Sequence, residues 1–253
     1  MIASMRHRRR SLPIVLAGLG VVATVAGCAD SGEGEAATPA SSAPASAGSS
    51  AAAEQDGGSP EDELAAALLP EEAFGPEADV VTVDVRQVST SVTGGLSPDA
   101  TTTPPECGQS LGATQLTPED FGASVAQSAT GPADVTVEVL AESEQLDGEA
   151  ASFDELVAQC PQVTVSAPDG TTATIDFTDL AVPDLGDASD GVAFTTAVRA
   201  ADGTGLTVPT FLAVALDGRR MVYLQRTGTS SAPLDEAAFS ELFEQAFAAQ
   251  QDR

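Results

Sequence analysis

Ser110 is the residue whose neighbours most resemble a catalytic motif, because 108–112 reads GQSLG and matches the G-x-S-x-G nucleophile elbow of hydrolases. A serine nucleophile needs a base within hydrogen-bond reach, and that base is usually histidine. The sequence has one histidine, His7, and no lysine that could replace it. His7 lies in an N-terminal segment that we expect to be removed, so we interpret the serine match as a coincidence.

Carboxylates are the remaining groups that could act as acids and bases, and the sequence has 38 of them. A pair of carboxylates could serve a glycosidase, but a sugar site uses aromatic stacking platforms. The chain offers no tryptophan and one tyrosine, Tyr223. We therefore expect no catalytic residue and no enzyme activity.

Three cysteines could carry other chemistry, namely Cys28, Cys107 and Cys160. Cys28 ends the sequence VAGC at 25–28, which resembles the bacterial lipobox, where the cysteine is diacylated on sulfur and becomes the new N-terminus. We expect Cys28 to be lipidated, which would hold the protein at the cell membrane on its extracytoplasmic face. The alternative is an ordinary signal peptide that contains a cysteine by chance.

The segment before Cys28 has the layout of a secretory signal. Four arginines lie within 6–10, and an apolar run follows at 12–26, broken by one proline and two glycines. This run is too short and too interrupted for a transmembrane helix. Arg9 and Arg10 could also start a twin-arginine signal, but the rest of that pattern is missing, so we expect the general secretory route.

Cys107 and Cys160 remain as a pair in an oxidising compartment, where we expect a disulfide bond. Such a bond would close a loop of about 54 residues and stabilise the fold by about 4 kcal/mol in the chain-entropy model. Two free buried thiols are the alternative. A metal site would need more thiolate or imidazole ligands than the chain has, so we expect no metal and no cofactor.

Two clusters of charged residues could bind ions or ligands. A calcium ion could be bound by Asp184, Asp187 and Asp190. Their spacing of three differs from that of an EF-hand loop, in which every second residue is a ligand, so we favour a solvated acidic loop. A second cluster on one expected hairpin consists of Arg219, Arg220 and Arg226. It could contact an anionic ligand or partner, or it could only protect a solvated edge strand.

The net charge argues against partners that are themselves strongly anionic. Residues 1–27 hold four of the ten basic residues and none of the 38 acidic ones, so the mature chain has a formal charge of 6 − 38 = −32. Binding to nucleic acid or to an anionic lipid surface by charge is therefore disfavoured.

Three segments follow from these observations: a lipoprotein signal peptide at 1–27, a tether at 28–59 and a folded domain at 60–253. The stretch 29–60 contains no Val, Ile, Leu, Phe or Tyr, so it cannot bury enough apolar surface to order itself. The tether would carry the domain away from the membrane.

The domain alternates helix and strand patterns. Capping signals and apolar stripes predict helices from 59 to 69, from Ser152 to Cys160, and from 235 to 249. Alternating apolar residues predict strands within 79–88, 124–129, 135–141 and 192–198. Turn sequences predict two hairpins, at 163–177 and 206–226, and tight turns force antiparallel pairing. We therefore expect an α+β domain with a mainly antiparallel sheet and one disulfide.

Several of these features resemble a known family. Four features carry the resemblance: AALLPEEAFG near the start, PPEC before a second cysteine in FDELVAQCPQVTV, a hairpin-rich second half and a Phe-rich last helix. Together they are similar to the extracellular sensor domain of the mycobacterial kinase PknH and related actinobacterial lipoproteins. The resemblance spans about 60–250. It implies a disulfide-tied α+β sheet with a cleft and without catalysis.

Two functions then remain. The first is a membrane-anchored binding or sensor module for a ligand or partner protein of the cell envelope. The second is a lipid or glycolipid carrier, which the tether would let move between membrane and wall.

Overall fold

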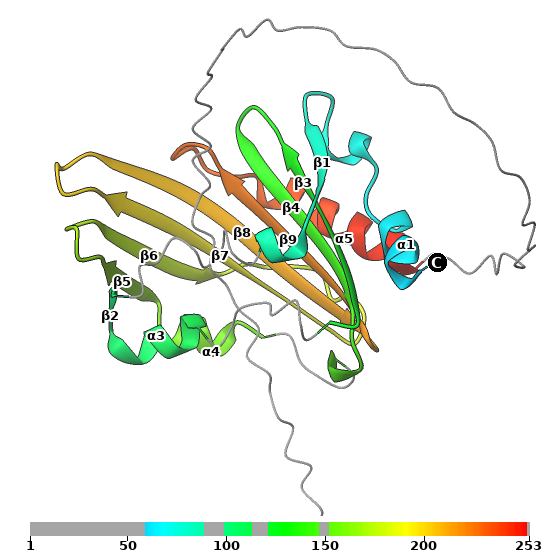
Figure 1. Ribbon diagram of the computed structural model, residues 1–253, viewed down its shortest axis with the longest axis horizontal. Coiled ribbons are helices and arrows are strands. Elements are labelled where there is room, and N and C mark those ends of the chain that lie inside the picture. The colour runs from blue at the N-terminus through cyan, green and yellow to red at the C-terminus, as the bar shows by residue number, and fades with distance from the viewer. Residues whose placement is uncertain (1–58, 89–98, 113–120, 147–151, 252–253) are drawn as a thin grey trace, which may run out of the picture.

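The computed structural model describes residues 59–88, 99–112, 121–146 and 152–251. In this part of the chain, nine antiparallel strands form one sheet in the order β1-β3-β4-β9-β8-β7-β6-β5-β2, with helices on both faces (Figure 1). The predicted α+β class and the antiparallel sheet are confirmed. No helix among the described residues is long and apolar enough to cross a membrane.

The sheet is built mostly from hairpins of neighbouring strands. The strands are β1 (Asp79–Val83), β2 (Thr101–Thr103), β3 (Ala123–Thr130), β4 (Asp134–Glu142), β5 (Gln162–Ser166), β6 (Thr172–Asp179), β7 (Ala188–Arg199), β8 (Gly205–Asp217) and β9 (Arg220–Gly228). The helices are α1 (Pro60–Ala66), η1 (Glu71–Phe74), α3 (Pro105–Gly112), η3 (Glu144–Leu146), α4 (Asp154–Gln159) and α5 (Glu236–Gln251).

One face of the sheet, the α5 face, is covered by α5 and α1. Figure 1 shows α5 running behind β8 and β9, with α1 beside it. The predicted stripe of α5 is confirmed, since its members are all buried: Phe239, Leu242, Phe243, Ala246 and Phe247. They pack against the odd-numbered residues of β8, such as Phe211, and the even-numbered residues of β9, such as Leu224.

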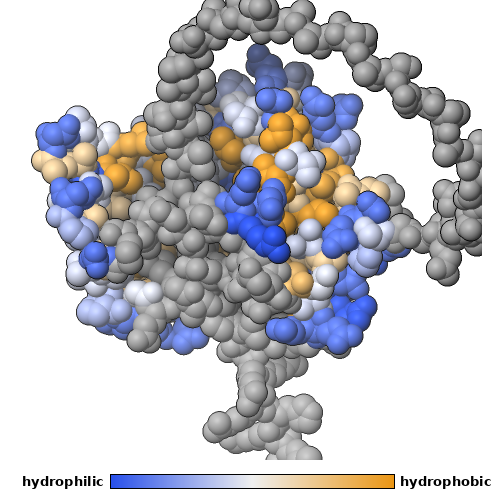
Figure 2. Space-filling model, in the orientation of Figure 1, coloured by the Kyte–Doolittle hydropathy of each residue, from blue (hydrophilic) through white to orange (hydrophobic). Residues whose placement is uncertain are grey.

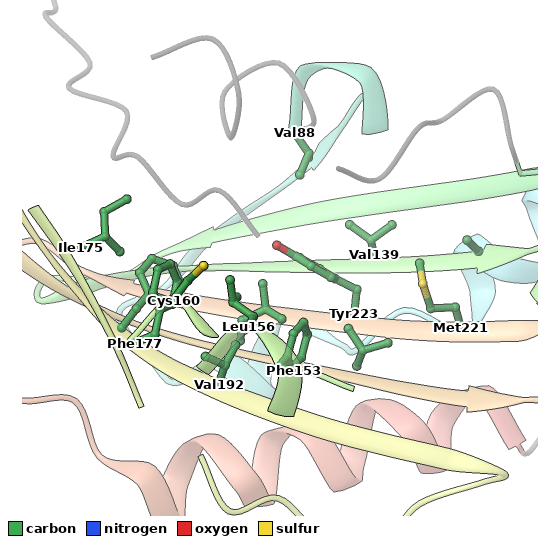
Figure 3. Packing of buried hydrophobic residues seen from close by; sticks show 14 of the residues in the cluster. Val88, Val139, Phe153, Leu156, Cys160, Ile175, Phe177, Val192, Met221 and Tyr223 are labelled. Carbon is green, nitrogen blue, oxygen red and sulfur yellow. The ribbon is translucent and has the colours of Figure 1, made fainter. Parts of the chain in front are cut away.

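The opposite face, the disulfide face, is covered by α3 and α4. Cys107 of α3 and Cys160 at the end of α4 form the predicted disulfide, with a Cα–Cα distance of 5.9 Å and a sequence separation of 53. Phe153 and Leu156 pack against strand residues such as Val192 (Figure 3). The bridge thus joins the two short helices over a single apolar cluster.

Several expectations about element boundaries were wrong. The strand expected within 79–88 ends at Val83, because Asp84 accepts a hydrogen bond from the backbone N–H of Arg86 and starts a helical turn at 85–88. α4 begins at Asp154 with Phe153 as its N-cap, so the capping box expected at Ser152 does not form. β2 and α3 were not expected at all.

We expect each single change, Cys107→Ala or Cys160→Ala, to lower the melting temperature by on the order of 5 to 15 °C. Both side chains are buried, so each change removes the bridge and a buried sulfur. Reducing agent should lower the parent to nearly the same temperature and leave both variants unchanged. Two reactive thiols in the denatured, unreduced protein would contradict this prediction.

Candidate functional site

The α5 face has an uncovered half, over β5, β6, β7 and the outer part of β8. α5 contacts β8 and β9, and α1 contacts β3 and β4, so no described helix lies over the other strands on this side. Side chains alternate between the faces of a sheet, and a face open to water carries polar residues. Here they are mainly threonines, exposed or half-buried: Thr103, Thr164, Thr172, Thr174, Thr178, Thr195 and Thr207.

A depression of about 400 Å³ lies in this threonine face, near the turns that end β6, β7 and β8. Its polar lining includes Thr172, Thr174, Thr207 and Arg199. Gly205 also lines it, and a Cβ at this position would lie 3.0 Å from the backbone oxygen of Val198. The volume falls within the range of roughly 300 to 1,000 Å³ that small-molecule sites occupy.

Arg199 supplies the positive charge of the depression. Its side chain is exposed, and no hydrogen bond or ion pair within the described part of the chain involves its guanidinium group. The neighbouring turns carry Asp169 and Asp202, whose pKa values are lowered by hydrogen bonds from Thr171 and Thr204. Both carboxylates therefore stay ionised and repel anions. A single anionic group of a ligand can bind in the depression only at Arg199.

The three arginines expected to contact an anion are not brought together. Arg219, in the turn before β9, forms ion pairs with Glu142 at 2.8 Å and Glu144 at 3.3 Å. Arg220 donates to the backbone oxygen of Gln250 near the end of α5. Arg226 donates through Nε to the Thr136 hydroxyl at 3.1 Å, six residues further along β9. Their role in ligand binding stays a prediction, but they do not form one site.

Of the aspartates at the start of β7, Asp187 and Asp190 act as hydrogen-bond acceptors. Asp187 accepts from the backbone N–H of Gly218 at 2.8 Å, and Asp190 accepts from the N–H groups of Phe153 and Gly191. Burial raises the pKa of Asp190. No group of three metal-ligating side chains occurs among the described residues.

Ser110 lies inside α3, where the whole 108–112 motif is helical, and not in a turn from strand to helix. The elbow geometry that a G-x-S-x-G nucleophile requires is therefore absent at this position. Its side chain lies outside the described residues. Cys28 also lies outside them, so its lipidation stays a prediction.

A row of polar side chains crosses the disulfide face on β8 and β9. The Tyr223 hydroxyl donates to Gln225 Oε1 at 2.6 Å, Gln225 Nε2 donates to the Thr227 hydroxyl at 3.1 Å, and Thr210 reaches the same hydroxyl at 3.3 Å. Burial raises the pKa of Tyr223, so this residue stays protonated and donates. These groups satisfy one another, which favours a structural role.

Comparison with solved structures identifies proteins of similar fold. An uncharacterised Mycobacterium smegmatis protein, described as an Rv0999 ortholog, matches with a TM-score of 0.51 and 20% identity, over 71% of this chain and 92% of that one. The extracellular domain of PknH from Mycobacterium tuberculosis matches with a TM-score of 0.45 and 14% identity, over 76% of this chain and 97% of that one. The first match confirms the resemblance predicted from the sequence as a likeness of fold. No family model and no curated protein matches the chain.

The threonine face is the feature that the sequence analysis missed. Its signal was present, because threonines alternate with apolar residues in TTATIDFTD at 171–179 and recur in FTTAVR at 194–199. Alternation alone shows that a strand has a polar side. It does not show that several such sides join in one uncovered surface with Arg199 at its end.

Proposed function

We propose that this chain is a lipid-anchored, extracytoplasmic binding module, and that the depression at Arg199 receives its ligand. The observation that carries the proposal is the Arg199 guanidinium group, which has no partner among the described residues and lies among threonine hydroxyls in a depression of about 400 Å³. The anchor rests on the sequence at 1–28, and the proposal includes no catalytic step.

The chemistry of the lining suggests the class of ligand. Threonine hydroxyls both donate and accept hydrogen bonds, and a guanidinium group binds a carboxylate or phosphate through two parallel hydrogen bonds. Only one cation lines the depression, and Asp169 and Asp202 lie in the adjoining turns. A ligand with one anionic group and several hydroxyls, such as an acidic sugar, fits this arrangement best.

One observation favours the second candidate, a lipid or glycolipid carrier. Figure 2 shows apolar side chains exposed on the viewed side of the sheet. Val81 of β1 and Leu206 of β8, with 49% and 47% of their surface exposed, are the large apolar residues most open to solvent. Both belong to the disulfide face by strand pairing, although Leu206, near the start of β8, also lines the depression. A carrier would use the disulfide face.

We expect Cys28→Ala to release the protein from the membrane fraction without changing the melting temperature of its domain. Anchor and domain are separated by the segment 29–59, which has no apolar residue large enough to pack on the fold. Membrane fractionation and thermal unfolding measure the two effects. A variant that still sediments with membranes would contradict the lipid anchor.

We expect glucuronate to bind about two- to fivefold more tightly than glucose, because an ion pair with an exposed arginine such as Arg199 contributes about 0.5 to 1 kcal/mol. The two sugars differ in one carboxylate, so the comparison isolates the charge. Amide chemical-shift changes on titration of the mature protein measure affinity and place the ligand. Changes should centre on Thr172, Thr174 and Thr207.

Arg199→Gln should remove the preference for glucuronate, whereas the control Arg219→Gln should keep it. Arg219 is also an exposed arginine in a hairpin, but Glu142 and Glu144 already engage it. Equal loss of the preference in both variants would contradict the site, as would shift changes confined to the disulfide face.

A further inference from the structure

Glu138 is a fully buried carboxyl group at the centre of β4. Its side chain is 0% exposed and points to the α5 face, next to Leu224 of β9 by strand pairing. An isolated carboxylate is costly to bury unless a cation or a set of donors compensates it. Glu138 takes part in no ion pair among the described residues, so hydrogen bonds are its only compensation.

These hydrogen bonds connect Glu138 to the chain just after α1. The backbone N–H of Leu69 donates to both carboxyl oxygens, at 3.2 and 3.4 Å. The side-chain amide of Gln127, on β3, donates to Glu138 at 2.6 Å and to the backbone oxygen of Leu69 at 2.8 Å. Both backbone groups of Leu69 are thus held by two buried polar side chains of the sheet.

The other contacts that fix α1 are apolar. Leu64, Ala67 and Leu69 are buried in the cluster that also contains Leu140 and Phe243. If α1 left the sheet, Gln127 and Glu138 would lose their cover and reach water. Undocking of α1 is therefore coupled to hydration of the carboxyl group.

Few charged groups lie near Glu138 on the elements packed around it. On its own strand and face, Asp134 and Glu142 are each four residues away, and Glu142 is paired with Arg219. On β9, Arg226 is two residues from Leu224, but its Nε donates to Thr136. The face of β3 beside Glu138 carries Val125, Gln127 and Ala129, none of them charged.

The helices add only peripheral charges. On α1 the acids occupy the exposed first turn: Glu61, Asp62 and Glu63. η1 begins with exposed Glu71 and Glu72, and the inward stripe of α5 is apolar apart from Gln250. None of these groups supplies a counter-charge to Glu138.

Protonation therefore controls the cost of keeping Glu138 covered. Burial raises the pKa of Glu138 from 4.5 to about 7, although the hydrogen bonds from Gln127 and Leu69 act in the opposite direction. Because the pKa is higher in the covered state than in water, the covered state is favoured most below about pH 5. This advantage is lost as the pH rises through 7.

We propose that Glu138 and Gln127 form a proton-controlled latch that holds α1 and Leu69 on the sheet in mildly acidic medium and loosens as the medium becomes neutral. The latch frees the N-terminal end of the domain, where 28–59 joins it. This inference does not rest on the ligand of the threonine face, since Glu138 lies on β4, which β9 and β8 separate from β7.

Hydrogen exchange on the mature protein at pH 5, 6, 7 and 8 tests the latch, with protection factors calculated for the peptide that contains Leu64 to Leu69. The equilibrium constant for opening should rise on the order of 50- to 100-fold between pH 5 and pH 8 and level off above pH 7. In Glu138→Gln, a neutral side chain of the same size, it should change less than threefold.

Glu142→Gln is the matched control, because Glu142 lies on the same strand and face but is half-buried and paired with Arg219. It should keep the pH dependence of the parent. The same pH dependence in the parent and in Glu138→Gln would overturn the latch. An equal loss of protection in β8 and β9 would overturn local release of α1, because opening would then be global.

Discussion

The central pair of strands, β8 and β9, is apolar on both faces of the sheet. The rest of the structure depends on a layer of packed residues that shields each of these two faces from water. Residues 211–216 and 221–225 are buried without interruption, which is typical of strands with a layer on each side. α5 forms the first cover with its phenylalanine stripe. On the other face the apolar cluster of β8 and β9 is completed by several short segments, namely the turn at 85–88, η3, α3 and α4. The last two are eight and six residues long, and the Cys107–Cys160 bridge joins them. Short helices gain little from packing individually, so the covalent bond compensates for their length.

Because α5 packs on the central strands β8 and β9, the part of the α5 face formed by β5, β6 and β7 stays open. A helix is about 10–12 Å wide and neighbouring strands lie about 4.8 Å apart, so α5 covers about two strands, β8 and β9. No other helix in the described part of the chain covers β5, β6 and β7 on this face. The open flank carries threonines because β-branched hydroxyl residues suit a strand and tolerate water. Arg199 then stands out on this surface as a cation that no described residue pairs with, in a strongly acidic chain. The proposed binding site is in this sense a consequence of how far the helical layer extends.

Local patterns allowed much of the fold to be predicted. The two hairpins around Gly170 and Gly218 and the helix α5 follow from turn residues and apolar periodicity, which act over a few neighbouring residues. β2 could not be predicted, because three threonines in a Pro-rich stretch become a strand only by pairing with β5. The sequence also does not show that Glu138 is buried. Its strand has the alternation of a half-buried strand, and this polar position is shielded from water only because α1 docks over it.

The candidate site was less predictable, for the same reason. Arg219, Arg220 and Arg226 are close in sequence, but their partners come from β4 and α5, which no local pattern indicates. The sequence around Arg199 contains no recognisable motif. The importance of Arg199 depends on its tertiary surroundings, in which none of the described residues pairs with it.

The central claim is that the ligand surface of this domain is polar and lies on the threonine face. Native mass spectrometry of the acylated protein, extracted from membranes in mild detergent, tests it most directly. The account predicts the mass of the lipidated chain with no acyl-bearing molecule bound non-covalently. A lipid or glycolipid retained in one-to-one ratio would contradict the account and favour a carrier that uses the opposite face.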